Sequence, residues 1–327
     1  MVVALQVVGG LAALILGAEL VVRYGSALAR RLGIPPMIIG LTIVSIGTSA
    51  PELAVGIDAM KVNAGSLAVG NIAGTNLVNL MLILGLSAAI RSIPFERRTL
   101  VLDLPGMAVA AVLLYLFSLD GELQTGEGVP LVAAAVLYTG ALSWWTKRES
   151  GIVRDDHAEV DLEARVHTPA DSGRRHTALA GVLLLAGIAI IVVGADWLVR
   201  GSTELARLFW VSDAFIGLTV VAIGTSAPEL VTTMMSTIRG DRDIAIGNLI
   251  GSSVYNLTLI LGVPVLVANG SGHINDNLLH IDLPIMVGVC LLCVPLFLTG
   301  RRLSRTEGTV LVAGYAAYLA YLLIART

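Results

Sequence analysis

The chain has 327 residues, of which 56% are hydrophobic and only 14% are charged, and its formal net charge is −3. A soluble protein of this length carries more charge, so the composition indicates an integral membrane protein surrounded by a lipid bilayer. The chain has no long block of charges of one sign, which argues against a nucleic-acid partner.

Ten apolar stretches are long enough to cross a bilayer, which takes roughly 20 mainly apolar residues. They predict an all-α integral membrane fold with ten transmembrane helices. In chain order the predicted spans are residues 2–22, 36–60, 66–90, 98–118, 128–146, 176–199, 213–238, 244–268, 279–299 and 308–325. A signal peptide has basic residues ahead of its apolar core, and none precedes the first span, so we expect it to be a retained helix.

The longest connection, residues 147–175, mixes both signs of charge without an apolar period, so it is expected to be a solvated linker. Lys and Arg are concentrated in alternate connections, on the same side as this linker. Only four of the 21 basic residues fall on the other side, namely Lys61, Arg200, Arg207 and Arg326. Because basic loops stay cytoplasmic, we expect a cytoplasmic linker and both termini outside, in the inner membrane of a bacterium or archaeon.

An internal repeat divides the chain into two halves. Residues 40–85 and 217–262 align without a gap, and 22 of the 46 pairs are identical. The first copy lies in a five-span half, residues 1–146, and the second in another five-span half, residues 176–327. Because five is odd, the second half would enter the membrane from the opposite side. The sequence therefore predicts two inverted five-helix repeats, an architecture of secondary transporters whose sites lie near the membrane midplane.

Each copy carries the motif Gly-Thr-Ser-Ala-Pro-Glu-Leu in the middle of a predicted span, which places Glu52 and Glu229 deep in the bilayer. A carboxylate at that depth costs on the order of 3 kcal/mol and needs a partner. No Lys or Arg lies at comparable depth nearby, so the two glutamates are either protonated or paired with a bound cation.

The residues around Glu52 favour the cation. Proline has no N–H and disrupts the preceding turn, so Pro51 is expected to free the carbonyl of Gly47, as Pro228 does for Gly224 in the second copy. Such carbonyls are tolerated in a bilayer only where they line a polar cavity. Thr48 and Ser49 share a helix face with Glu52. Together these groups offer the hard oxygen ligands that calcium and sodium prefer.

A second pair of segments, residues 70–79 and 247–256, repeats a pattern of glycines, hydroxyls and amides. In each copy a hydroxyl residue precedes an asparagine by four positions, so both would face one side of a helix. These residues are Thr75 and Asn79 in the first copy and Ser252 and Asn256 in the second. Plain helix packing by small residues is the alternative, and the duplication makes it the weaker one.

Three further acids lie within or beside the spans. Glu19 and Asp196 stand four residues before Arg23 and Arg200, so local ion pairs are expected. Asp58 has no acidic counterpart in the second copy and is either a vestibule charge or without a role.

These motifs resemble the two alpha-repeats of the cation/calcium exchanger superfamily, and specifically of its prokaryotic sodium/calcium exchanger (calcium/sodium antiporter) family. The resemblance covers the whole chain in topology and about 90 residues strongly. It implies a secondary active transporter, not an enzyme, that exchanges sodium for calcium by alternating access at an oxygen-lined midplane site. No cofactor is expected beside the transported ions, and a monomer would suffice.

The resemblance also implies roles for individual residues. Glu52 and Glu229 would be the central carboxylates shared by calcium and sodium. The other implied ligands are the carbonyls of Thr48 and Thr225 on calcium, the side chains of Ser49, Ser226, Thr75 and Ser252 and the carbonyls of Ser45 and Ala222 around sodium, and Asn79 and Asn256 beside the middle position. Some members have Asp where Asn256 stands, which leaves the sodium stoichiometry open, and Thr75 replaces a usual serine. The first and sixth helices would slide as the gate.

Three alternatives remain. A proton/calcium exchanger of the same superfamily would move calcium in response to a pH gradient without sodium. A calcium channel would use the same oxygens but usually needs a pore on an oligomer axis. An intramembrane enzyme would use the glutamates as an acid/base pair, but no Cys, His or paired aspartates lie at their depth to serve it.

Overall fold

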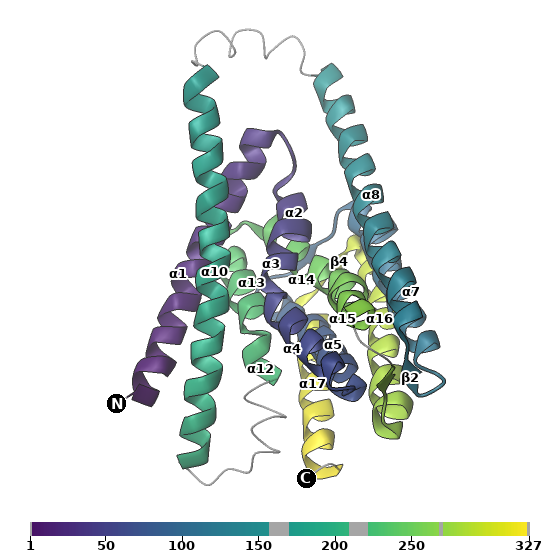
Figure 1. Ribbon diagram of the computed structural model, residues 1–327. Coiled ribbons are helices and arrows are strands. Elements are labelled where there is room, and N and C mark those ends of the chain that lie inside the picture. The colour runs from purple at the N-terminus through teal and green to yellow at the C-terminus, as the bar shows by residue number, and fades with distance from the viewer. Residues whose placement is uncertain (1, 157–169, 209–221, 268–270, 326–327) are drawn as a thin grey trace.

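The computed structural model describes residues 2–156, 170–208, 222–267 and 271–325, and these residues are almost entirely helical. Figure 1 shows long helices that run roughly in one direction, with the short broken helices between them. The predicted helical membrane fold is confirmed at this level.

The first half begins with a long helix and continues with a chain of shorter ones. Among the described residues, five short segments are π-helices, labelled η1, η2, η3, η6 and η7. The first-half elements are α1 (Val2–Leu32), α2 (Pro36–Ile39), η1 (Gly40–Val44), α3 (Ser45–Thr48), α4 (Ala50–Lys61), α5 (Gly65–Leu77), η2 (Val78–Ile83), α6 (Leu84–Ile90), η3 (Thr99–Asp103), α7 (Leu104–Phe117) and α8 (Thr125–Asp156).

The second half follows the same order wherever it is described. Its elements are α10 (Ala170–Leu208), α12 (Ala222–Thr225), α13 (Ala227–Arg239), α14 (Arg242–Tyr255), η6 (Asn256–Ile260), α15 (Leu261–Val267), η7 (Leu278–Asp282), α16 (Leu283–Leu298), the 3₁₀ turn η8 (Thr299–Arg301) and α17 (Arg305–Ala325). Two pairs of π-helices correspond between the halves. The segments η2 and η6 each contain an asparagine, and η3 and η7 each end in an aspartate.

Eight helical segments in the described part of the chain are long and apolar enough to cross a membrane, or nine with the bent pair Pro36–Thr48 and Ala50–Lys61. The predicted span 213–238 starts outside the described residues, which contain only its later part, α12 and α13. The predicted linker 147–175 is helical at both ends, because α8 and α10 continue into it, and residues 157–169 lie outside the described residues.

Four two-residue strands modify the predicted all-α fold. β1 (Ile93–Pro94) pairs antiparallel with β4 (Arg302–Leu303), and β2 (Glu122–Leu123) pairs with β3 (Gly272–His273). Each pair joins a loop of the first half to a loop of the second. Pairing satisfies the backbone polar groups of loops that leave their helices, a need that hydropathy does not reveal.

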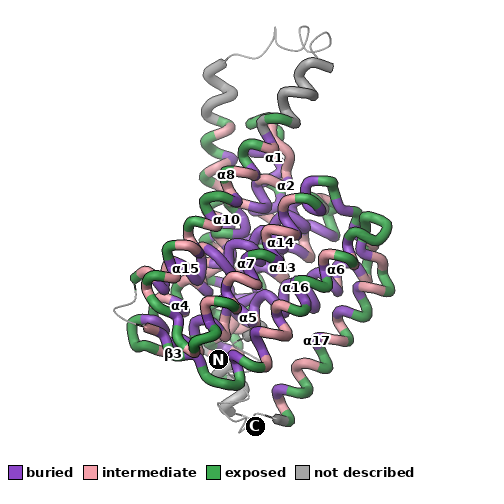
Figure 2. Tube along the Cα trace, turned by 90° about the vertical axis from the view of Figure 1, so that its right-hand side faces the viewer, coloured by how far each residue is buried: buried purple, intermediate pink, exposed green. Residues whose placement is uncertain are grey.

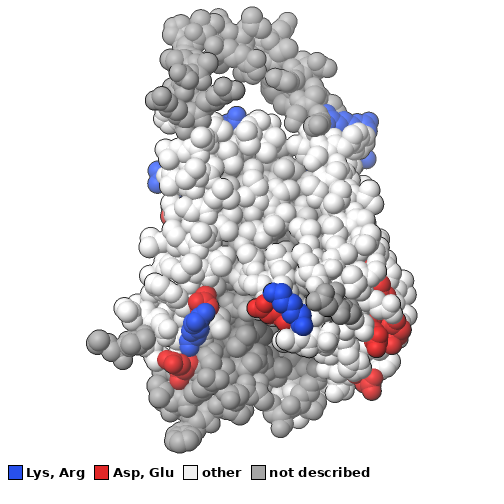
Figure 3. All heavy atoms as spheres, viewed as in Figure 1, with Lys and Arg blue, Asp and Glu red and all other residues white. Residues whose placement is uncertain are grey.

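The outward surface is suited to lipid. Leu137 of α8 and Ile324 of α17 are 73% and 85% exposed. Figure 2 shows buried residues concentrated on central helices such as α13 and α14, whereas α17 is largely exposed. Figure 3 shows a band across the middle of one face that is nearly free of charged side chains. The central helices therefore hold the polar groups away from this apolar surface.

The hydrophobic core consists of two clusters. The larger one joins α5 to α7 and α14 to α17, with the π-helices between them. The smaller one lies between α1 and α10 and includes Leu14, Val21, Leu184 and Ile191, with Ala227 at the start of α13. The helices α1 and α10 thus pack mainly on each other, as a pair beside the larger core.

Glycines allow α1 and α10 to cross closely in antiparallel fashion. Gly10 faces Gly194, and Gly17 faces Gly187. A Cβ atom on Gly194 would lie 2.9 Å from the Cβ of Ala13 and 3.0 Å from the carbonyl oxygen of Gly10. Small residues at such crossings are typical of membrane helix pairs.

A leucine at position 194 is therefore expected to force the two helices apart, whereas a leucine at Gly181, where a Cβ meets nothing within 4 Å, is not. The Gly194→Leu variant should lose about 1–3 kcal/mol of stability through overpacking. Thermal unfolding of the detergent-solubilised proteins measures this, with Gly181→Leu as the matched control. Equal melting temperatures for the two variants would contradict the close crossing.

Candidate functional site

The predicted proline motifs mark the points where two helices break. In the first half the helix is interrupted at Ser49 (φ −82°, ψ 11°), and the segments on either side are bent by 43°. In the second half Ser226 (φ −84°, ψ 3°) separates α12 from α13 in the same way. Pro51 and Pro228 stand in the first turn of the helices that follow, where proline needs no hydrogen-bond acceptor.

Glu52 and Glu229 lie in the first turns of α4 and α13, and both are 0% exposed. The positive end of the helix dipole favours a carboxylate at this position. The two carboxylates are close enough to repel each other. The hydroxyl of Ser49 donates a hydrogen bond of 3.1 Å to Oε1 of Glu229, so the break in the first half touches the carboxylate of the second. The two motifs therefore build one site.

The two predicted asparagines complete the site from the opposite halves. Asn79 lies in η2 and Asn256 begins η6, and both are fully buried. The helix of Glu229 contacts η2, and the helix of Glu52 contacts η6. Each glutamate helix thus packs against the asparagine segment of the other half. π-Helical turns are frequent at functional sites because they displace side chains from the regular helical register.

Many polar atoms of this region have no hydrogen-bond partner among the described residues. A buried polar atom left in this way costs about 1–3 kcal/mol. The atoms are Oε1 and Oε2 of Glu52, Oε2 of Glu229, the amide oxygen and nitrogen of Asn79 and of Asn256, and the hydroxyls of Ser226, Thr232 and Ser252. Two carboxylates among neutral oxygens suit a hard cation such as calcium or sodium.

The remaining predicted ligands lie around this centre. Ser45 and Thr48 are fully buried in α3, and the carbonyl of Ser45 accepts hydrogen bonds from the amide of Ser49 at 3.1 Å and the hydroxyl of Thr48 at 3.3 Å. Thr75 is buried in α5. Ala222 begins α12, and its side chain lies outside the described part of the chain.

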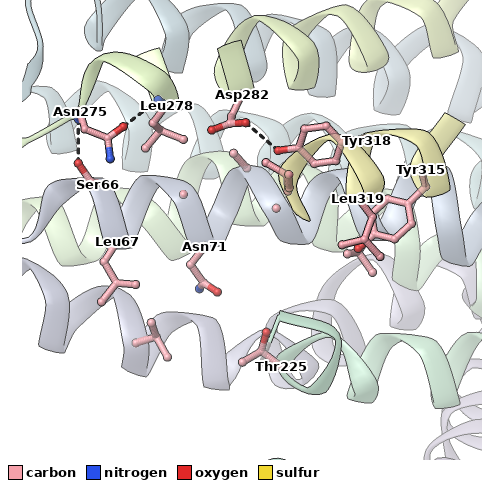
Figure 4. Close-up of a pocket in the computed structure, with 16 residues that line it drawn as sticks. Ser66, Leu67, Asn71, Thr225, Asn275, Leu278, Asp282, Tyr315, Tyr318 and Leu319 are labelled. Atoms are coloured by element: carbon pink, nitrogen blue, oxygen red, sulfur yellow. Dashed lines mark hydrogen bonds between the residues drawn. The ribbon is translucent and has the colours of Figure 1, made fainter. Parts of the chain in front are cut away.

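Thr225, at the end of α12, borders a cavity of about 320 Å³ between α4, α5, η7 and α17. Figure 4 shows Asn71 and Thr225 on one side of α5, and Asp282 with Tyr318 on the other. The hydroxyl of Tyr318 donates to Asp282 at 2.9 Å. Gly74 leaves this part of α5 open, since a Cβ there would meet nothing within 4 Å.

The corresponding aspartate of the first half is enclosed differently. Tyr138 donates to Asp103 at 3.0 Å, which matches Tyr318 and Asp282, but Arg98 also pairs with Asp103 at 3.7 Å. Arg98, the first residue of the predicted span 98–118, is buried. The two halves therefore share an aspartate–tyrosine pair, and in the first half the guanidinium of Arg98 lies beside it.

Sequence reasoning missed three polar residues near the site. Thr232, three residues after Glu229, is fully buried with its hydroxyl unpaired among the described residues. Its counterpart in the repeat is Val55, so comparison of the halves gave no signal. Thr233 and Asn248 are also buried and hydrogen-bond to each other at 3.3 Å. Asn248 recurs in the first half, which is the signal that could have identified it.

Of the expected ion pairs, one is confirmed and one is wrong. Asp196 pairs with Arg200 at 2.8 Å. Glu19 pairs with Arg239 of α13 instead of with Arg23, because α1 packs against α13 and brings that guanidinium within reach.

Asp58 and the two cysteines lie away from the site. Asp58, whose side chain is 81% exposed, pairs with Lys61 at 3.6 Å on the surface. Cys290 and Cys293 are buried free thiols in α16.

A helical membrane protein with two buried carboxylates among unpaired oxygens has the features of an ion-transport protein. The family model described as sodium/calcium exchanger protein matches residues 2–144 and 179–324. The chain therefore belongs to the sodium/calcium exchanger family, as its motifs predicted.

Individual relatives agree with this assignment. The inner membrane protein YrbG of Escherichia coli (strain K12) is 35% identical over 318 residues, which cover 96% of this chain and 94% of YrbG. The sodium/calcium exchanger MaX1 of Methanosarcina acetivorans is 32% identical over 343 residues, covering 96% of each chain. A more distant relative, the Ca(2+)/H(+) antiporter ChaA of Bacillus subtilis, is 25% identical over 296 residues, which cover 86% of this chain and 81% of ChaA.

The fold also matches solved structures. A structure of the sodium-calcium exchanger NCX_Mj, soaked with 10 mM Na⁺ and zero Ca²⁺, superposes with a TM-score of 0.82 at 26% identity. The match covers 98% of this chain and 99% of NCX_Mj.

Calcium is expected to stabilise the detergent-solubilised protein, because a ligand that binds only the folded state at 100 times its Kd adds about 2.7 kcal/mol. The rise in melting temperature should disappear in Glu52→Gln and Glu229→Gln. Asp58→Asn, on the exposed surface, should keep it. A calcium-induced rise that survives in both glutamine variants would contradict the site.

Proposed function

We propose that the protein is a secondary active antiporter that exchanges sodium for calcium across the membrane at a single oxygen-lined site. The observation that carries the proposal is the meeting of two fully buried carboxylates, Glu52 and Glu229, one from each half. The unpaired hydroxyl and amide atoms around them support a cation as their partner. The names of MaX1 and NCX_Mj support the choice of ions.

In this proposal Glu52 and Glu229 bind both ions. Calcium is also held by the carbonyls of Thr48 and Thr225, and sodium by the side chains of Ser49, Ser226, Thr75 and Ser252 and the carbonyls of Ser45 and Ala222, with Asn79 and Asn256 beside the middle position. The hydroxyl of Ser49 donates its hydrogen to Glu229, which leaves its oxygen lone pairs free for a cation.

Exchange follows from the charge of the site. Two carboxylates balance one Ca²⁺, while two or three Na⁺ ions could use the same oxygens. The ions then compete for one site instead of binding together. A site that is open alternately to each side of the membrane, and that is occupied by one kind of ion at a time, couples the two gradients.

We further propose ten spans in two inverted repeats, residues 1–146 and 176–327, joined by the linker 147–175. Figure 1 supports this arrangement, since α1 begins and α17 ends at the lower end, whereas α8 ends and α10 begins at the upper end. In Figure 3 the Lys and Arg side chains near the upper end have no Asp or Glu beside them, whereas those in the lower half lie against acidic side chains; the excess of positive charge at the upper end supports a cytoplasmic linker and outer termini. The printed name of YrbG supports an inner membrane location.

Calcium uptake into sodium-loaded proteoliposomes is expected for the wild-type protein and should require the sodium gradient. Glu52→Gln and Glu229→Gln should each fall to the level of empty liposomes, because each removes one of the two charges that bind calcium. Radioactive calcium accumulation measures the uptake, and Asp58→Asn is the control that keeps it.

The same assay separates the alternatives. Uptake that ignores sodium and follows a pH gradient would replace this proposal with proton/calcium exchange, the activity that the name of ChaA describes. Uptake that needs no gradient of either ion, and does not saturate, would indicate a channel.

The gate in this proposal is the α1–α10 pair, sliding across the other eight helices. Most residues of the smaller hydrophobic cluster lie on these two helices, which supports a unit that moves as one body. Glu19 of α1 and Arg239 of α13 form an ion pair across the boundary between this unit and the rest of the protein.

A crosslink at that boundary is expected to stop exchange. The double variant Glu19→Cys with Arg239→Cys would be joined by a bis-maleimide, with Cys290 and Cys293 first replaced by alanine. Sodium-driven calcium uptake should fall in proportion to the crosslinked fraction, while each single cysteine variant treated with the same reagent keeps its rate. Full uptake from completely crosslinked protein would rule out sliding at this boundary.

A further inference from the structure

The side chain of Asn248, fully buried in α14, joins elements of both halves next to the site. Its Oδ1 accepts from the hydroxyl of Thr48 in α3 at 3.3 Å, in a hydrogen bond shared with the carbonyl oxygen of Ser45, which lies at the same distance. Its Nδ2 donates to the hydroxyl of Thr233 in α13 at 3.3 Å. The carbonyl of the same residue accepts from the hydroxyl of Ser45 at 2.9 Å. One residue therefore ties α3, α13 and α14 together.

These contacts act on groups beside the carboxylates. Thr48 is followed directly by Ser49, whose hydroxyl bonds to Glu229. The hydrogen bond from Thr48 to Asn248 therefore restricts the positions of the Thr48 carbonyl and the Ser49 hydroxyl. Thr233 is four residues after Glu229, on the same face of α13. Asn248 thus restrains both the turn of the first half and the carboxylate helix of the second.

The first half has the asparagine but not this set of bonds. The repeat counterpart of Asn248 is Asn71, whose Nδ2 has no hydrogen-bond partner among the described residues. Asn71 and Thr225, the counterpart of Thr48, both border the cavity of Figure 4. The position that matches Thr233 is Gly56, which has no hydroxyl and packs against Pro264. The two asparagines that correspond in the repeat, Asn71 and Asn248, therefore lie in different surroundings.

We infer that Asn248 is a positioning residue for the cation site, through Thr48 and Thr233, and that Asn71 has no such part in this conformation. The inference rests on the proposed function, since it takes the site to bind calcium. Residues that orient metal ligands without touching the metal typically change metal affinity 10–100-fold when they are replaced. An effect of this size is expected for Asn248 and for the Thr233 hydroxyl.

Calcium binding to the purified, detergent-solubilised protein, measured by isothermal titration calorimetry, tests the inference. Asn248→Ala and Thr233→Val are expected to raise the Kd for calcium at least about tenfold. Thr233→Ser, which restores the hydroxyl, should stay within about threefold of the wild type, and so should the matched variant Asn71→Ala. If Asn248→Ala does not fold, the comparison of Thr233→Val with Thr233→Ser still tests the inference.

Two results would overturn the inference. One is equal weakening by Thr233→Ser and Thr233→Val, which would mean that the hydroxyl has no role. The other is weakening by Asn71→Ala as large as that by Asn248→Ala, which would mean that the two halves are equivalent. Calcium binding is measured here without transport, so the two hypotheses can fail separately. A wild-type protein that binds calcium but does not exchange it for sodium would refute the proposed function. The calcium affinities of the variants could still be compared in that case.

Discussion

Two carboxylates that lie fully buried among apolar helices lose their hydration, and Glu52 and Glu229 also repel each other. Two features of the surrounding structure reduce this cost. The breaks at Ser49 and Ser226 place the carboxylates at helix N-termini, where the dipole favours negative charge. The buried oxygens around them suit a cation, and the lipid-facing helices keep this polar centre away from the acyl chains.

The burial of the two glutamates and the helix breaks beside them could be predicted from the sequence because their causes are local. The repeated Ser-Ala-Pro-Glu motif located both breaks, because a proline that follows small polar residues favours a new helix start, and the breaks at Ser49 and Ser226 lie two residues before Pro51 and Pro228. A glutamate in the middle of an apolar stretch must be buried, and Glu52 and Glu229 are. The internal repeat added Asn79 and Asn256, which do lie on segments that contact the opposite glutamate helix.

Other features depend on contacts between distant segments, and the sequence could not reveal them. Thr232 has a valine in the matching position, so the repeat gave no indication of its buried hydroxyl. Glu19 was expected to pair within its own helix, but the packing of α1 against α13 supplies Arg239 instead. Arg98 stands at the very end of a predicted span and is nevertheless buried beside Asp103. The π-helical register of η2 and η6 likewise has no local sequence signature.

The two small ribbons have a consequence for how the two halves are joined. Each half contributes one strand to both ribbons, since β1 pairs with β4 and β2 with β3. In the second half, β3 stands where β1 stands in the first, and β4 stands where β2 stands. Two identical copies of one half, inserted in opposite directions, would therefore form the same two ribbons around a two-fold axis. In each ribbon, β1 of one copy would pair with β2 of the other. A self-complementary dimer of one such unit would therefore be joined by both ribbons without a covalent link.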